Sequence, residues 1–284
     1  MQEQDILVEI PNEDLPNLRD LYSKQLPFAT HVYSFLNTAM KWMKVSPEKS
    51  YIKIFSPNGD WRSDGTFVAL LQWSCYDLFV FTLEETCERL EHALMTTQRI
   101  DWSQVILFYA VHQNHTDTVY KVLEKLELKV EHSTKTDFWW MPKEQASQLT
   151  VACPENFEIK ILKPEHAEII NEIWPHRYPG SVNYLRTFIE MNGGHGVFTK
   201  TDGKLVSWVL KNQMGTLGIL QTIDAYKRMG LGSAVTKSLS REIALEGHNP
   251  LGTVLVENTA SQAMFRNIGF SPSDWCQYIV VEHD

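Results

Sequence analysis

The sequence predicts an α/β (α+β) protein of two domains, each with helices packed on a mixed, largely antiparallel sheet. The chain has 284 residues, of which 43% are hydrophobic and nine are Trp, so it can bury more than one domain core. Apolar segments of strand length alternate with segments of helical periodicity. Residues 142–156 are polar, contain Pro and lack such a period. We therefore expect a linker there, an N-terminal domain over residues 1–145 and a C-terminal domain over residues 157–284.

The N-terminal half alternates strands with helices. Residues 13–44 have helical periodicity, which Pro27 interrupts. Thr82 followed by Glu85 has the spacing of a capping box, and this predicts a helix that begins at Thr82. The other elements expected here are a helix over residues 115–126 and strands over residues 51–55, 67–71, 78–81, 105–111, 128–130 and 138–141.

The C-terminal half predicts the order strand, two helices, three antiparallel strands, helix, strand, helix, strand. Asp202-Gly203 is a hairpin signal between two of these strands. Residues 192–196 place His195 among three glycines and are expected to form a flexible, exposed turn. The expected strands cover residues 157–162, 197–199, 205–210, 218–223, 253–256 and 277–281, and the expected helices cover residues 163–174, 183–191, 260–267 and the segment from the glycine loop to Gly247.

A glycine loop stands between the apolar strand at residues 218–223 and the following helix. Gly230 and Gly232 lie two residues apart, directly after Lys227 and Arg228. Glycine lets the backbone turn tightly and approach a ligand closely. Backbone N–H groups at a helix start, together with the helix dipole, attract anions. This pattern favours a phosphate or pyrophosphate site, and an ordinary strand-to-helix turn is the alternative.

A second motif follows the next apolar strand. Asn258 precedes a short helical segment that ends at Gly269-Phe270. The two motifs together resemble the GNAT acyltransferase superfamily, whose first motif, Gln/Arg-x-x-Gly-x-Gly/Ala, is matched by Lys227-x-x-Gly230-x-Gly232 with Lys in the first position. The family's second motif is an Asn followed by a short helix ending in Gly-Phe. The order of the predicted elements is also that of a GNAT domain.

The whole chain resembles the glycine N-acyltransferase-like family more narrowly. Leu26-Pro27 with His31-Val32-Tyr33, the strand around Trp208, and residues 222–227 carry this similarity. The resemblance implies two GNAT-like halves, the first degenerate and the second binding acetyl-CoA or another acyl-CoA, with no metal. It further implies that the cofactor is bound by Gln221, Thr222, Ile223, Lys227, Arg228, Met229, Gly230, Leu231, Gly232, Ser233, Asn258 and Phe265.

Two positions depart from the family's acid–base pattern. Thr216 stands near the position at which glycine acyltransferases are thought to carry a Glu base. Phe265 stands seven residues after Asn258, where GNAT enzymes often have a Tyr that protonates the leaving thiolate. The sequence therefore predicts an acyl-CoA-dependent N-acyltransferase for a small amine or amino acid, with a non-catalytic acyl-CoA-binding or scaffold protein as the alternative.

Glu257 and Ser261 are the candidate catalytic residues that remain. Glu257 ends its strand beside the cofactor motif, but it could be a surface carboxylate, and Ser261 could simply open the short helix. Asp224 could form the turn after the central strand, and Trp208 could be part of the core rather than a wall of an acyl pocket. His195 could reach the site, although an exposed loop histidine is the simpler interpretation.

Charge and composition exclude several classes. The formal net charge of −9 opposes general nucleic-acid binding, and the sequence contains no apolar run of membrane-spanning length. The cysteines Cys75, Cys87, Cys153 and Cys276 lack metal-binding spacing and are expected to be buried free thiols. The acidic N-terminus resembles no signal or transit peptide, so we expect a cytoplasmic protein, although the family resemblance also allows a mitochondrial one. Acyl-chain length, acceptor and oligomeric state stay open.

Overall fold

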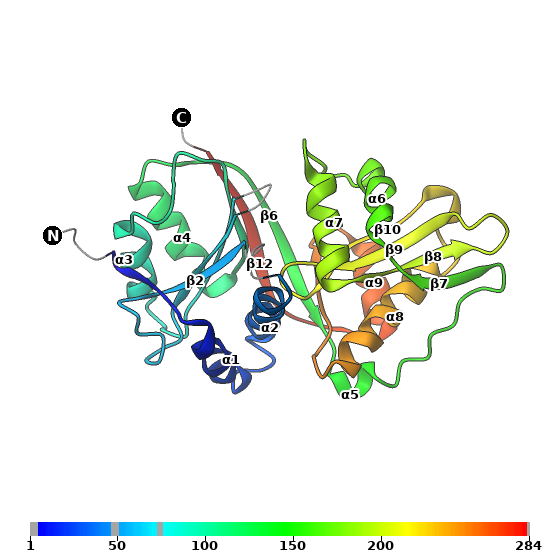
Figure 1. Cartoon of the computed structure of the whole chain (residues 1–284), viewed down its shortest axis with the longest axis horizontal. Helices are drawn as coiled ribbons and strands as arrows, with labels where there is room; N and C mark the ends of the chain where they lie inside the picture. The colour runs from blue at the N-terminus through cyan, green and yellow to red at the C-terminus, as the bar shows by residue number, and fades with distance from the viewer. Residues whose placement is uncertain (1–4, 47–50, 73–75, 283–284) are drawn as a thin grey trace. The chain divides into compact units, whose positions relative to one another are not determined.

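The computed structural model describes residues 5–46, 51–72 and 76–282 and divides into two compact units (Figure 1). Unit 1 is formed by residues 1–137 and 274–284, and unit 2 by residues 138–273. These units do not follow the expected boundaries at residues 145 and 157. The chain enters unit 2 within one strand and returns to unit 1 within another, so the last segment of the chain contributes to the first unit.

Unit 1 contains a mixed sheet in which the β1–β2, β2–β3, β3–β4 and β5–β12 pairs are antiparallel and the β4–β5 pair is parallel. Its strand order is β1-β2-β3-β4-β5-β12-β6. The segments expected at residues 128–130 and 138–141 form one long strand, β6, instead of two. The strands are β1 (Leu7–Glu9), β2 (Ile52–Pro57), β3 (Phe67–Gln72), β4 (Tyr76–Phe81), β5 (Ile106–His112), β6 (Lys129–Trp140) and β12 (Ser271–Glu282).

The helices of unit 1 are α1 (Leu15–Ser23), α2 (Thr30–Val45), α3 (Glu88–Thr96) and α4 (Gln113–Lys125). As predicted, the first helical region is interrupted around Pro27. The faces of α3 and α4 that carry Leu90, Leu94, Val119 and Leu123 are buried in the apolar core of the unit.

The capping-box prediction at Thr82 was wrong, because α3 begins six residues later. The Oγ1 atom of Thr82 accepts a hydrogen bond from the backbone N–H of Glu84 at 3.0 Å, which closes a local turn. The carboxylate of Glu84 accepts the N–H of Arg89 at 2.9 Å in the first turn of α3. The acidic side chain that caps α3 is therefore Glu84 and not Glu85.

Unit 2 has the strand order β6-β11-β10-β9-β8-β7, with β10 and β11 parallel and the β7–β8, β8–β9 and β9–β10 pairs antiparallel. Helix α8 packs on β8, β9 and β10, and α7 packs on β9 (Figure 1). The strands that lie wholly in this unit are β7 (Phe157–Ile161), β8 (Gly194–Thr199), β9 (Leu205–Lys211), β10 (Leu217–Thr222) and β11 (Leu251–Leu255). The helices are α5 (Lys143–Ala146), α6 (Ala167–Ile173), α7 (Ser181–Asn192), α8 (Leu231–Leu245) and α9 (Thr259–Ile268).

The expected turn at residues 192–196 is largely strand, because β8 begins at Gly194. A Cβ atom on Gly194 would lie 2.7 Å from Cδ2 of Leu210, and one on Gly196 would lie 2.6 Å from Cδ1 of Leu205. The two glycines therefore meet a packing requirement of the sheet and do not mark a flexible loop.

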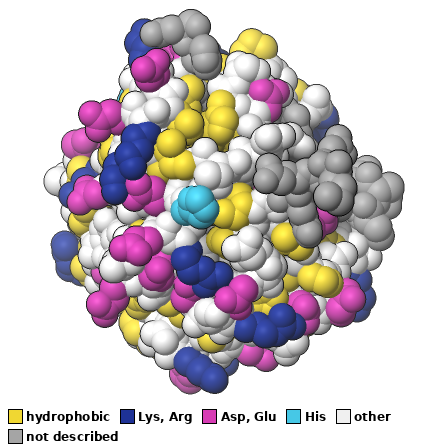
Figure 2. Space-filling view, turned by 90° about the vertical axis from the view of Figure 1, so that its left-hand side faces the viewer, with side chains coloured by type: hydrophobic (Ala, Val, Ile, Leu, Met, Phe, Trp, Pro, Cys, Tyr) yellow, Lys and Arg dark blue, Asp and Glu magenta, His cyan; other side chains and the backbone are white. Residues whose placement is uncertain are grey.

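The described surface carries both charge signs, and the described cysteines are free thiols. On the face shown in Figure 2, side chains of both charge signs are interspersed, and no continuous basic patch covers the part of that face that the structure describes. None of the helices over the described residues has the length and apolar character needed to cross a membrane. Cys87 and Cys276 are buried free thiols as expected, whereas Cys153 is partly exposed, which corrects the expectation for that residue, and Cys75 lies outside the described residues.

Candidate functional site

The central strand of unit 2 is irregular at its midpoint. On the β9 side, β10 pairs at Leu217 and Gly218 and again at Gln221 and Thr222, with a register shift between them. Ile219, inside this bulge, has a φ of +53°, a conformation that is unusual for a β-branched residue. The bulge therefore interrupts the regular pairing of β10 with β9 at Ile219 and Leu220.

The other edge of β10 is largely unpaired. Both β10 and β11 lie wholly within the described residues, and the single register pair between them joins Leu217 to Gly252. Beyond this pair the remainder of β10 has no residue partner on its parallel neighbour. An unpaired strand edge of this kind offers main-chain hydrogen bonds to an extended ligand.

The glycine loop leads from β10 into α8 as predicted. Gly230 is the residue before the helix and has a φ of +78°, which favours glycine. The first helical bond of α8 runs from the N–H of Ala234 to the carbonyl of Gly230 at 3.0 Å. The N–H groups of Leu231, Gly232 and Ser233 have no intrahelical acceptor and no other partner among the described residues, which suits an anion.

The start of α8 lies against the end of the central strand. A Cβ atom on Gly232 would be 3.3 Å from Oγ1 of Thr222 and 3.6 Å from Sδ of Met264 on α9. The Oγ1 atom of Thr222 is in turn 2.8 Å from Oγ of Ser207 on β9. Packing therefore brings the glycine loop, the strand end and α9 together, as the two sequence motifs required.

The two cations of the loop are not equivalent. Nζ of Lys227 lies 2.6 Å from Oδ1 of Asp224, and both side chains are exposed. Arg228 is exposed, has a φ of +63° and has no ion pair or hydrogen bond within the described part of the chain. Arg228 is thus the cation that is available to an anionic ligand. Met229 is 46% exposed beside it.

The second motif forms the predicted short helix, α9, and Asn258 caps its N-terminus. Oδ1 of Asn258 accepts the N–H of Ser261 at 3.0 Å at the start of α9. Glu257 is exposed after the end of β11. Gln262, which the sequence did not single out, donates from Nε2 to the carbonyl oxygens of Leu255 and Val256 at 3.3 and 2.9 Å. This bond ties α9 to the end of β11.

The positions that depart from the acid–base pattern are both buried. Oγ1 of Thr216 donates to Oδ1 of Asn212 at 3.0 Å, so the hydroxyl is committed to a local turn. The ring of Phe265 packs against Phe270 and Trp139 with centroid separations of 4.9 and 6.3 Å. Trp208 is completely buried, in agreement with its interpretation as a core residue.

His195 is not an exposed loop residue, which corrects the simpler interpretation of the sequence. It lies on β8 and is 8% exposed, with Nδ1 2.9 Å from Oγ of Ser238 and Nε2 2.8 Å from Oε2 of Glu242. Its strand is two positions from β10, roughly 10 Å at ordinary strand spacing, so His195 does not contact the bulge. Ser238 and Glu242 stand four residues apart on α8, and this spacing was the available signal for a shared partner.

Comparison with known proteins agrees with this geometry. Residues 194–279 match the FR47-like protein family, and residues 6–122 match a domain of unknown function (DUF5645). In an alignment of 216 residues the chain is 22% identical to glycine N-acyltransferase of Bos taurus, and the match covers 68% of this chain and 72% of that protein. In an alignment of 212 residues it is 24% identical to glycine N-acyltransferase-like protein 2 of Homo sapiens, and the match covers 67% of this chain and 69% of that one.

Solved structures share the fold over almost the whole chain. A Drosophila protein solved by structural genomics has a TM-score of 0.90 and 24% identity, and the match covers 98% of this chain and 99% of that one. A tandem GNAT protein from the clavulanic acid biosynthesis pathway has a TM-score of 0.54 and 12% identity, with 97% of each chain covered. The expected tandem GNAT fold is therefore confirmed. The FR47-like domain and the glycine N-acyltransferase relatives support an N-acyltransferase enzyme.

Proposed function

We propose that this GNAT-fold N-acyltransferase moves an acetyl or longer acyl group from a CoA thioester to the amine of a small molecule or amino acid, with a glycine-like acceptor. The observation that carries the proposal is the bulged central strand β10, unpaired along β11 beyond Leu217 and followed directly by the glycine loop at the start of α8. The names of the two curated relatives favour an amino-acid acceptor.

Acyl-CoA would use the site in two parts. Its pyrophosphate fits the N–H groups of residues 231–233, with Arg228 as a neighbouring charge. Its pantetheine amides fit the unpaired edge of β10, and the backbone at the bulge supplies N–H groups for the thioester oxygen. The residues that would hold the co-substrate are those that the two sequence motifs indicated, with Asn258 acting through its helix cap and Phe265 through the core beneath the strands.

The chemistry is an acyl transfer. The neutral amine attacks the thioester carbonyl, a tetrahedral oxyanion forms and accepts hydrogen bonds from backbone N–H groups, and its collapse releases CoA thiolate. A thiol with a pKa near that of free cysteine, about 8.5, leaves without a dedicated acid, so Phe265 in place of Tyr is tolerable. The ammonium proton of the acceptor must go to a base. We propose Glu257 for this step, directly or through water, with Ser261 next to the path.

A non-catalytic acyl-CoA-binding protein is the second candidate. It is favoured by Thr216 and Phe265, because neither buried side chain can exchange a proton with a substrate on the strand edge. This protein would retain the glycine loop and the unpaired edge of β10 and would bind acyl-CoA without turnover.

Calorimetric titration of acetyl-CoA and then longer acyl-CoAs into the full chain tests both candidates. Saturable binding followed by release of CoA thiol in the presence of glycine or another amino acid supports the enzyme. Binding without thiol release across an amino-acid panel supports the binding protein. No binding of any acyl-CoA would contradict both.

A further inference from the structure

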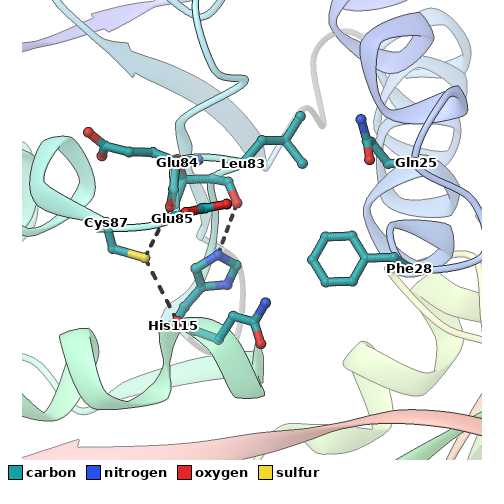
Figure 3. A pocket seen from close by; sticks show the side chains of 9 residues that line it. Gln25, Phe28, Leu83, Glu84, Glu85, Cys87 and His115 are labelled. Atoms are coloured by element: carbon teal, nitrogen blue, oxygen red, sulfur yellow. Dashed lines mark hydrogen bonds between the residues drawn. The ribbon is translucent and has the colours of Figure 1, made fainter.

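Unit 1 contains a cavity of about 530 Å³, within the usual range for small-molecule sites (Figure 3). It is formed by the turn between α1 and α2, the segment that follows β4, and the start of α4. None of its lining residues belongs to unit 2, so it is not part of the proposed acyl-CoA site. The lining residues are Gln25, Phe28, Thr82, Leu83, Glu84, Glu85, Cys87, Asn114 and His115.

The ring of His115 carries an unused hydrogen-bond acceptor. The side chain is 1% exposed, and its Nε2 atom lies 3.0 Å from the carbonyl oxygen of Thr82. A carbonyl oxygen only accepts hydrogen bonds, so Nε2 carries the proton and Nδ1 has a free lone pair. Nδ1 has no hydrogen-bond partner within the described residues. A buried acceptor without a donor costs free energy, which a ligand with an N–H group would recover.

The neighbouring His112 does not provide that donor. Its own Nδ1 atom accepts the N–H of Asn114 at 3.2 Å, and its Nε2 atom lies 3.6 Å from Oδ2 of Asp274. Burial, together with the nearby His112, lowers the pKa of His115 to about 4. His115 is therefore uncharged near neutral pH and does not repel a cation.

The charge of the lining is negative. Glu84 and Glu85 both line the cavity, and no Lys or Arg does. The backbone N–H of Arg89 occupies one carboxylate oxygen of Glu84, whereas Glu85 is exposed and has no partner among the described residues. Figure 3 shows the side chain of Phe28 extending across the cavity toward His115 with the edge of its ring foremost, so Phe28 adds an apolar wall.

A metal ion does not fit this set of groups. The thiol of Cys87 donates to the carbonyl oxygens of Glu84 and Asn114 at 3.5 and 3.8 Å, and burial raises its pKa, so it is not a thiolate ligand. Across the described residues, no group of three His, Cys, Asp or Glu side chains has the arrangement of a metal site.

We propose that this cavity binds a small organic ammonium ion, whose N–H group donates to Nδ1 of His115 and whose charge is balanced by Glu85. Such an ion supplies the missing donor, the positive charge and an apolar stem for Leu83 and Phe28. The site does not depend on acyl transfer by unit 2.

The test is titration of the full chain with n-butylammonium, with n-butanol and butyrate as neutral and anionic probes of the same size. We expect saturable binding of butylammonium, weaker binding of butanol and no binding of butyrate. The ¹⁵N resonance of His115 Nδ1 should shift as butylammonium binds, which separates this cavity from an acceptor site in unit 2. A parallel titration with Nα-acetyl-lysine methylamide distinguishes a free amine from a lysine side chain.

Two variants test whether the binding of butylammonium depends on the carboxylate of Glu85 in the cavity lining. Glu85→Gln should raise the dissociation constant of butylammonium about two- to fivefold, because the carboxylate is exposed and screened. Glu88→Gln removes another exposed charge, outside the cavity lining, and should leave the constant unchanged. Equal affinity for butanol and butylammonium, no saturable binding below about 10 mM, or an unmoved His115 resonance would overturn the proposal.

Discussion

The ring of Phe265 fills the space that a side chain at Gly252 would need. A Cβ atom on Gly252 would lie 3.0 Å from Cε1 and 3.2 Å from Cζ of this ring, and 3.4 Å from Cβ of Leu217. Gly252 and Leu217 form the one register pair between β10 and β11 in these described strands. The residue that replaces the expected tyrosine therefore packs beneath the point from which the two parallel strands separate.

This contact predicts that Gly252→Ala destabilises unit 2 by about 1–3 kcal/mol, because the added methyl group overpacks the core against Phe265. The smaller side chain of Phe265→Leu should relieve the clash. In urea denaturation, the double variant should then be more stable than the sum of the two single changes predicts, by about 1 kcal/mol. Additive effects would show that Phe265 is not the group that restricts Gly252.

Local structure was predictable from the sequence where a single segment of the chain determines it. The glycine loop between β10 and α8 and the short helix after Asn258 formed as expected, because neighbouring residues determine both. The bulge at Ile219 was not predictable, because its residues belong to an apolar segment typical of an ordinary strand and the register shift lies in the pairing with β9.

Long-range pairing explains the remaining differences. His195 was expected in an exposed turn because its glycine neighbours suggested a loop, but they are required by Leu205 and Leu210 on the adjacent strand. The cavity around His115 combines residues from 25 to 115, and no single segment indicated it. The proposed roles of Glu257, Ser261 and the cofactor residues stay predictions.

The loop geometry predicts that Gly230→Val weakens acyl-CoA binding about tenfold or more, since the side chain would project where the anion approaches and strain a φ of +78°. Gly247→Val is the matched control. Gly247 lies at the other end of the same helix with a φ of +91°, and neither glycine has an atom within 4 Å of an added Cβ. Both variants should lose similar stability, about 1–2 kcal/mol. Calorimetric titration should then find weaker acyl-CoA binding in Gly230→Val alone. An equal loss of binding in both variants would contradict an anion site at the glycine loop.

Substitution of Glu257, the proposed base, should lower the turnover rate without changing the affinity for acyl-CoA. If it accepts the ammonium proton of the acceptor, Glu257→Gln should lower kcat by about 10²–10⁴-fold with an unchanged dissociation constant for acyl-CoA. Glu155→Gln removes another exposed carboxylate of unit 2, before the opposite edge strand β7, and should leave kcat unchanged. A thiol-release assay measures both variants. Full activity of Glu257→Gln would exclude it as the base.

The buried histidines predict that the folded protein loses stability as the pH decreases through the mildly acidic range. Burial lowers the pKa of His115 to about 4 and that of His31 well below its usual value of 6.5, and His112 shifts in the same direction. The folded protein therefore binds fewer protons than the unfolded chain between about pH 6.5 and 4. The histidines make their whole contribution to the free energy of unfolding when the pH is above their pKa in the unfolded chain. This contribution decreases as the pH falls through the window.

The expected loss from His115 is about 3 kcal/mol by pH 4, at 1.36 kcal/mol for each unit of pKa shift. Carboxylates with lowered pKa values, such as Asp5 and Glu91, lose their contribution only below their usual values of 3.8 and 4.5, so they act at the acidic end of the window. Urea denaturation from pH 7 to 4.5, together with NMR titration of the histidine rings, measures the effect. His115→Asn should reduce the pH dependence even if it also lowers stability at pH 7. An unfolding free energy that does not change between pH 7 and 4.5 would contradict the lowered pKa values of these histidines in the folded chain.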